Sequence, residues 1–72
     1  MNKKLLQAKM KIYGDTNATL ATAVGCSPQR FSAKINEKDG AEFTQGEIGR
    51  IIRRYHLTNE EVHSIFFASL VS

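Results

Sequence analysis

The chain has 72 residues, of which 42% are hydrophobic and 24% charged, and its formal net charge at pH 7 is +3. A chain of this length predicts a single domain, residues 1–72, with a core too small to house a buried catalytic pocket and its supporting residues. The one cysteine excludes an internal disulfide, and Lys9 and Lys11 interrupt the N-terminal apolar run before it resembles a secretory segment. Nothing approaches a membrane-spanning length, so we expect a cytoplasmic protein with no membrane partner.

The charges are unevenly distributed along the chain. Up to Asn36, six basic residues stand against one acidic residue, whereas from Glu37 onward four basic residues stand against six acidic ones. This asymmetry favours a polyanionic partner for the N-terminal half and a different role for the remainder.

The first predicted helix covers residues 2–13 and ends at Gly14. Its apolar residues recur at helical spacing, at Leu6, Met10 and Tyr13 with Leu5 and Ile12 beside them. The lysines of this helix either lie near phosphates or, as we favour for most of them, only solvate its exposed side.

Two short helices with a break between them are predicted in residues 16–36. Thr16 is expected to cap the first, which runs to residue 24, and Ser27 the second, residues 28–36, which opens with a proline. Gly25 follows the first helix, where a chain often needs a positive φ. Two short helices joined by a tight turn containing glycine form the helix-turn-helix pattern, although the same geometry also occurs as plain packing.

The second of these helices has one apolar and one polar side. Phe31 and Ile35, four residues apart, are expected to face the core, and the first turn of the opposite side is expected to enter the major groove of DNA. There Gln suits adenine, Arg suits guanine, and a small Ala can rest on a thymine methyl. The residues expected to face base edges are Gln29, Arg30, Ser32 and Ala33. Those expected to contact the DNA backbone are Thr16, Asn17, Thr19, Lys34 and Asn36. The alternative is that Gln29, Arg30 and Asn36 only solvate an exposed helix face, and that Thr16, Asn17 and Thr19 only cap their helix.

The C-terminal half predicts a charged loop, residues 37–42, followed by two helices that each open with a capping box. These boxes are Thr44 with Glu47 and Thr58 with Glu61. The fourth helix carries an apolar stripe of Ile48, Ile51, Ile52 and Tyr55, with Arg50, Arg53 and Arg54 on its outer side. The fifth helix is expected to bury Val62, Ile65 and Phe66 and to run to about residue 69. With no strand signal in the chain, we expect an all-α fold of five helices.

The tail has more apolar residues than one helix face can bury. Phe67, Leu70 and Val71 fall off the core stripe, and such surplus apolar surface often marks an association site. The alternative is that Phe67 folds over the edge of the core.

No catalytic or metal-binding pattern is present. Cys26 is interpreted as a small core residue, and His56 and His63 lack a metal-ligand spacing. The glycines are scattered and form no phosphate loop. We therefore expect no enzyme activity, no metal and no cofactor.

The chain resembles a known family in several stretches. Leu20-Ala21, Gly25, Cys26, Ser27 and Phe31-Ser32 match the signature of phage repressor and Cro-type DNA-binding domains. The order F-S-A-K-I-N, E-F-T-Q-G-E-I and L-T-N-E-E-V-H-S-I-F-F extends this resemblance, over most of the chain, to small phage regulators of the Cro type. Departures occur at Met10 and at Lys34 and Ile35, where the inward apolar residue is displaced by one position.

This resemblance implies a five-helix phage repressor-like domain that binds DNA. Some members of the group modulate repression by pairing with the phage repressor itself. Our first hypothesis is a transcriptional regulator of a temperate-phage lysis–lysogeny switch, acting in the host bacterial cell. It would bind double-stranded operator DNA as a homodimer on two half-sites. The second hypothesis is an antirepressor that binds the cognate phage repressor protein.

Overall fold

The computed structural model describes residues 1–67, and in this range the chain forms helices and loops without a strand. The helices in chain order are α1 (Lys3–Ile12), α2 (Asn17–Val24), α3 (Pro28–Ile35), α4 (Gln45–Tyr55) and α5 (Asn59–Val62). A 3-10 turn, η1 (Lys38–Gly40), follows α3, and a π-helical turn, η2 (His63–Phe67), continues α5. The predicted all-α class is confirmed.

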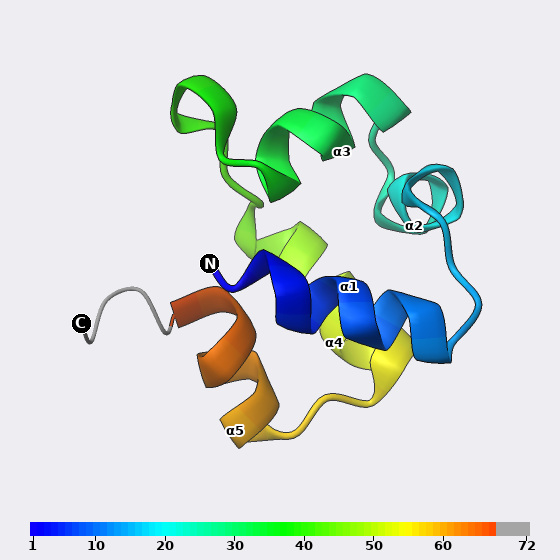
Figure 1. Ribbon diagram of the computed structural model, residues 1–72, viewed down its shortest axis with the longest axis vertical. Coiled ribbons are helices and arrows are strands. Elements are labelled where there is room, and N and C mark those ends of the chain that lie inside the picture. Colours follow the sequence, from blue (N-terminus) through cyan, green and yellow to red (C-terminus); the bar gives the residue numbers. More distant parts are fainter. Residues whose placement is uncertain (68–72) are drawn as a thin grey trace.

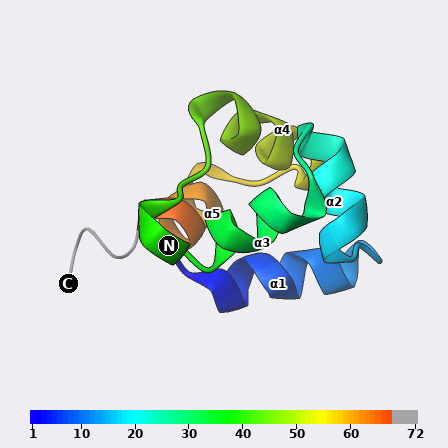
Figure 2. The same ribbon diagram turned by 90° about the horizontal axis from the view of Figure 1, so that it is seen from above.

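The helices surround one hydrophobic core. Figures 1 and 2 together place α1 and α4 on opposite sides of the molecule, with α3 at one end and α5 at the other. The start of the chain lies beside η2, because the backbone N–H of Asn2 donates to the carbonyl oxygen of Ile65 at 2.6 Å. This arrangement leaves the outer side of α3 uncovered by any other helix.

Helices α2 to α5 each begin at a capping residue that the sequence predicts. Thr16 and Ser27 each accept a hydrogen bond from a backbone N–H three residues further on, at the starts of α2 and α3. Both predicted capping boxes, at the starts of α4 and α5, form with their two reciprocal hydrogen bonds. Each cap satisfies backbone donors that a helix end otherwise leaves unpaired.

The core draws on α1 to α4, on the loops beside α4 and on η2. Its buried apolar residues are Leu6, Met10, Leu20, Ala21, Val24, Phe31, Ile35, Phe43, Ile51, Tyr55, Leu57, Ile65 and Phe66. A row of aromatic rings links its two ends: Phe31 lies 5.5 Å from Phe43, and Phe43 lies 6.4 Å from Phe66, between ring centroids. Ile35 is 2% exposed, so the inward position at the end of α3 belongs to this residue and not to Lys34.

The apolar face of α1 is narrower than predicted. Leu6 and Met10 are buried, but Leu5 is 41% exposed, Ile12 73% and Tyr13 48%. Tyr13 stands just after the helix, where its hydroxyl donates to the carbonyl oxygen of Tyr55 and the two rings lie 4.8 Å apart. A helix of 10 residues that touches the core along one line has room for only two fully buried side chains.

The C-terminal elements also depart from the prediction. The loop predicted for residues 37–42 contains the turn η1, and Val62, expected in the core, is only partly buried. The predicted burial of Ile65 and Phe66 is confirmed, and both residues lie in the π-helical turn that continues the four-residue α5. Leu70, Val71 and the predicted end of the last helix lie outside the described residues.

Candidate nucleic-acid interface

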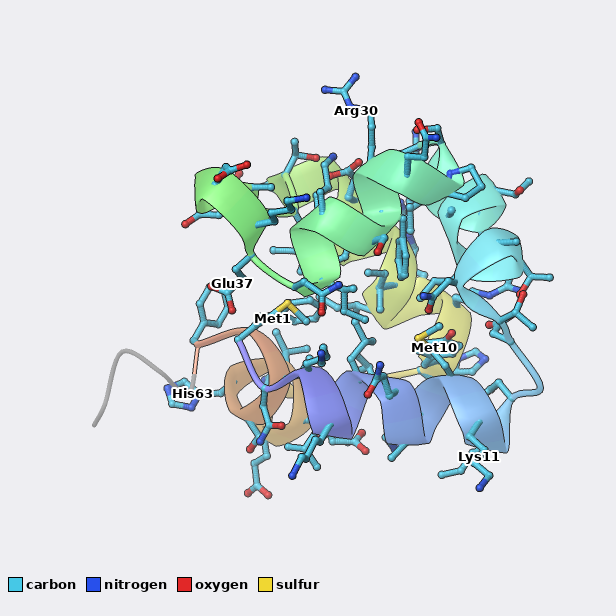
Figure 3. The ribbon with its side chains drawn as sticks, turned by 45° about the horizontal axis from the view of Figure 1, so that its top comes forward. Met1, Met10, Lys11, Arg30, Glu37 and His63 are labelled. Carbon is cyan, nitrogen blue, oxygen red and sulfur yellow. The ribbon has the colours of Figure 1, made fainter. Side chains whose placement is uncertain are left out.

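The first turn of α3 projects two polar side chains from a buried anchor. Ser27 caps the helix by accepting from the backbone N–H of Arg30, and Phe31 and Ile35 fix its inner side in the core. Gln29 and Arg30 are consequently exposed, and Figure 3 shows Arg30 extending away from the body of the protein. These two residues are the best-presented members of the predicted base-facing set.

The other predicted base-facing residues lie deeper. Ser32 and Ala33 are both partly buried, and the hydroxyl of Ser32 faces the side-chain amide of Asn36 at 3.5 Å. All four residues lie on α3, and those in its first turn, Gln29 and Arg30, are more exposed than Ser32 and Ala33.

The turn between α2 and α3 is fixed from behind by α4. Gly25 has a φ of +84°, and its N–H donates to the carbonyl oxygens of Ala21 and Thr22. The guanidinium of Arg50 donates to the carbonyl oxygen of Val24 at 2.8 Å. This positive group lies at the C-terminal end of α2, where the helix dipole favours it. A Cβ added at Gly25 would lie 2.8 Å from Nη1 of Arg50, so the guanidinium would have to move.

The start of α2 uses most of its polar groups internally. The hydroxyl of Thr16 accepts from the N–H of Thr19, and the hydroxyl of Thr19 accepts from the N–H of Thr16. The Thr19 hydroxyl also donates to Asp15 at 2.8 Å. Asn17 is exposed, so of the three residues predicted to contact the DNA backbone here its side chain is the one not used in the cap.

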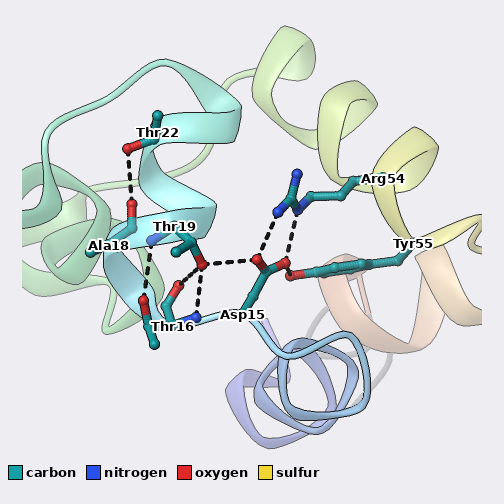
Figure 4. Close-up of polar contacts among 7 residues, drawn as sticks. All are labelled: Asp15, Thr16, Ala18, Thr19, Thr22, Arg54 and Tyr55. Carbon is teal, nitrogen blue, oxygen red and sulfur yellow. Dashed lines mark hydrogen bonds and ion pairs between the residues drawn. The ribbon is translucent and has the colours of Figure 1, made fainter.

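A polar cluster that the sequence reasoning missed joins this region to α4 (Figure 4). Asp15 accepts two hydrogen bonds from Arg54 and one from the hydroxyl of Tyr55 at 2.6 Å. The guanidinium of Arg54, helped by the hydroxyls of Tyr55 and Thr19, holds the pKa of Asp15 far below its usual range. Burial, together with the negative charge of Asp15, raises the pKa of the Tyr55 hydroxyl. The cluster fixes α2 against α4 and so determines how α3 is presented.

Two of the predicted backbone contacts are engaged elsewhere. Lys34 donates to both carboxylate oxygens of Glu47 at 2.7 Å, and the two side chains are only 14% and 12% exposed. Burial opposes the ionised form of Glu47, but the hydrogen bonds from Lys34 and Thr44 outweigh it, and its pKa is lowered. Asn36 accepts from the ammonium of Lys3 and donates to the carbonyl oxygen of Ser32.

Three basic residues of the N-terminal half lie at α3: Arg30 and Lys34 on the helix, and Lys3 against Asn36 at its end. Lys9 pairs with Glu61, Lys34 with Glu47, and Lys3 with the Asn36 amide. Figure 3 places Lys11 on the opposite side of the molecule from Arg30. The positive charge next to Gln29 is therefore mainly that of Arg30 itself.

Of the predicted association residues, Phe67 lies within the described range and is 40% exposed, whereas Leu70 and Val71 lie beyond it. Within residues 1–67, no helix combines the length and apolar character needed to cross a membrane.

Comparisons of the chain with protein-family models, with curated proteins and with solved structures give no match. The role of α3 is therefore inferred from its geometry and chemistry.

Proposed function

We propose that this protein is a sequence-specific DNA-binding regulator of the phage repressor-like class, with α2 and α3 as a helix-turn-helix and α3 as the recognition helix. The observation that carries this proposal is the first turn of α3, where Gln29 and Arg30 are exposed on a helix anchored by Phe31 and Ile35. The resemblance to small Cro-type regulators supports the same assignment and points to a temperate-phage lysis–lysogeny switch in the host cytoplasm.

In this proposal the two long side chains read bases and their neighbours shape the contact. Arg30 forms paired hydrogen bonds with a guanine and Gln29 with an adenine, since their donors and acceptors match those base edges. The small apolar side chain of Ala33 contacts a thymine methyl. Asn17 and the backbone at the start of α2 meet the phosphates. One such helix reads only a few base pairs, so a homodimer on two half-sites supplies the remaining specificity.

The test is a gel shift on the promoter region of the phage switch with Gln29→Ala and Arg30→Ala. Each substitution is expected to lower affinity for the cognate site by roughly tenfold, because a bidentate base contact is worth about 1–3 kcal/mol of discrimination. Lys11→Ala is the matched control, because it removes an exposed cation on the opposite side of the molecule. Unchanged affinity and sequence preference in both α3 variants would remove this helix from the base-reading role.

A second candidate function is binding to the cognate phage repressor as an antirepressor. The exposed ring of Phe67 and the pairing of Lys9 and Lys34 with carboxylates favour it, because both features suit a protein partner better than a polyanion. A gel shift run with and without the repressor separates the two functions. An antirepressor alters the repressor–operator band without forming a band of its own.

A further inference from the structure

A pocket separate from the base-facing residues lies between the loop after α3, the start of α4 and η2. It has a volume of about 250 Å³. Its apolar wall consists of Phe43, Ile48, Phe66 and Phe67, and its rim carries Glu37 and Glu42. An apolar interior with charged groups at the rim is the usual form of a site that holds one large side chain.

The aromatic wall has a fixed part and an exposed part. Phe43 and Phe66 are 9% and 8% exposed, and their rings meet edge to face at an interplanar angle of 85°. Phe67 is 40% exposed at the edge of the pocket. The inner wall is thus held by the core, while the ring of Phe67 remains open to contact.

The rim is acidic. Residues 37–42 carry three carboxylates and the ammonium of Lys38. The N-terminal ammonium of Met1, which also lines the pocket, pairs with Glu37 at 2.7 Å, whereas neither Asp39 nor Glu42 forms an ion pair with any residue of the described chain. Lys34, which also lines the pocket, is already neutralised by Glu47. With Glu37 paired to Met1 and Lys34 to Glu47, a ligand at this rim meets the uncompensated negative charge of Glu42.

We propose that this pocket binds a protein segment that carries a large apolar side chain beside lysine or arginine. The apolar group enters against Phe43 and Phe66, and the neighbouring cation meets Glu42 and the face of Phe67. Phosphates are repelled by the same carboxylates. A second copy arranged about a two-fold axis brings its own acidic rim against this one, which disfavours self-pairing here. The site is independent of base reading by α3, and it supplies a contact surface for the second candidate function.

The experiment titrates the full ¹⁵N-labelled chain with blocked hexapeptides and follows the backbone amide shifts. The probe is RRLFRR, and its matched controls are EELFEE, which reverses the charge, and RRAARR, which removes the apolar group. RRLFRR is expected to shift the amides of Glu42, Phe43 and Ile48 and to bind at least about tenfold more tightly than either control. Equal binding of RRLFRR and EELFEE, or shifts confined to α1 and α5, would overturn the proposal.

Two charge-reversing variants localise the effect. Glu42→Lys is expected to weaken RRLFRR binding by about fivefold or more, because it turns an attraction at the rim into a repulsion. Glu60→Lys makes the same change on α5, outside this pocket, and is expected to change affinity less than about twofold. Similar losses in both variants would show general charge attraction only.

Two further results would assign the pocket to another occupant. Amide shifts of the pocket residues that depend on protein concentration alone would assign it to a second copy of the chain. Peptide binding that appears only when residues 68–72 are deleted would assign it to the C-terminal tail. Each of these results overturns the proposal while leaving the gel-shift test of Gln29 and Arg30 unaffected.

Discussion

Arg54 holds Asp15 with two parallel hydrogen bonds, from Nε to Oδ2 at 2.8 Å and from Nη2 to Oδ1 at 2.7 Å. The aspartate side chain is 5% exposed and the arginine side chain 40%. A paired geometry of this kind is stronger and more directional than a single ionic contact. Because it joins the residue before the α2 cap to the end of α4, it fixes the angle at which α2, and α3 behind it, leave the body of the protein.

Asp15→Asn is expected to lower the free energy of unfolding by about 2–3 kcal/mol. The substitution keeps the shape of the side chain but removes the charge that receives the hydrogen bonds of Arg54 and Tyr55. Urea denaturation measures the loss. The control is Asp39→Asn, at a carboxylate exposed in η1, which is expected to change stability by less than about 0.5 kcal/mol. Equal losses in the two variants would contradict a structural role for the Asp15 cluster.

The lowered pKa of Asp15 makes the stability of the fold depend on pH. The pKa of Asp15 is lower in the folded chain than the unfolded value of about 3.9, so its contribution is fully present above that pH and is lost as the pH falls towards its folded pKa. Between about pH 4 and pH 2 the unfolding free energy of the parent chain is expected to fall by up to about 1.4 kcal/mol per pH unit from this group. Asp15→Asn should show a shallower acid limb. Part of the slope persists, because the pKa of Glu47 is also lowered. Parallel acid limbs in the two proteins would show that Asp15 does not titrate in this way.

We expect opposite effects on stability from two glycine substitutions, one in the turn between α2 and α3 and one inside α4. Gly25→Ala is expected to destabilise the protein by more than about 1 kcal/mol, because φ is +84° and the new Cβ meets Arg50. Gly49→Ala is expected to stabilise it by about 0.5–1 kcal/mol, because Gly49 lies inside α4 with nothing within 4 Å of an added Cβ. Thermal and urea unfolding of both variants test the difference. A neutral or stabilising Gly25→Ala would mean that the turn tolerates a side chain.

The local features of this fold were predictable from the sequence, because short-range patterns determine them. The caps at Thr44 and Thr58 follow from a hydroxyl and a glutamate three residues apart, and both formed. The inward side of α3 follows from the spacing of Phe31 and Ile35, and both are buried. The use of Gln29 in reading bases stays a prediction.

The cross-chain contacts were not predictable, because they depend on how the helices pack. Asp15 and Arg54 are 39 residues apart, and nothing in the pattern around either residue identifies the other. Lys34 shows the same limit: helical spacing placed it beside the DNA-facing residues, but only the fold brings Glu47 to its ammonium. A charged residue at the edge of an apolar stripe, such as Lys34 beside Ile35, is the one local signal of this ion pair in the sequence.

The distribution of charge predicts a modest salt dependence of DNA binding. Each neutralised phosphate adds about −0.9 to the slope of log K against log salt. With Lys34 paired to Glu47 and Lys11 on the far side, the cations at the α3 surface and the loop after it are Arg30, Lys38 and Lys3, whose ammonium donates to Asn36 at the end of α3. A slope of about −1 to −3 per protomer is therefore expected from fluorescence anisotropy across salt concentrations. A slope steeper than about −4 per protomer would require the other α1 lysines to reach the DNA.

The last prediction separates the roles of two cations on α3. Lys34→Ala is expected to lower the free energy of unfolding by about 1–3 kcal/mol, because it leaves the largely buried carboxylate of Glu47 without the ammonium that donates to both of its oxygens. Its specific DNA affinity, measured where the variant is fully folded, is expected to change by less than about threefold.

Arg30→Ala is expected to show the reverse. Its side chain is exposed and forms no ion pair within residues 1–67, so stability should change by less than about 0.5 kcal/mol. Its specific affinity should fall by roughly tenfold, as expected for a lost base contact. Urea denaturation and anisotropy titrations on the same two preparations provide both readings. If Lys34→Ala loses as much affinity as Arg30→Ala while it is fully folded, Lys34 must leave Glu47 in the complex and meet the DNA backbone, because an ammonium that stays paired with a carboxylate adds almost nothing to phosphate binding.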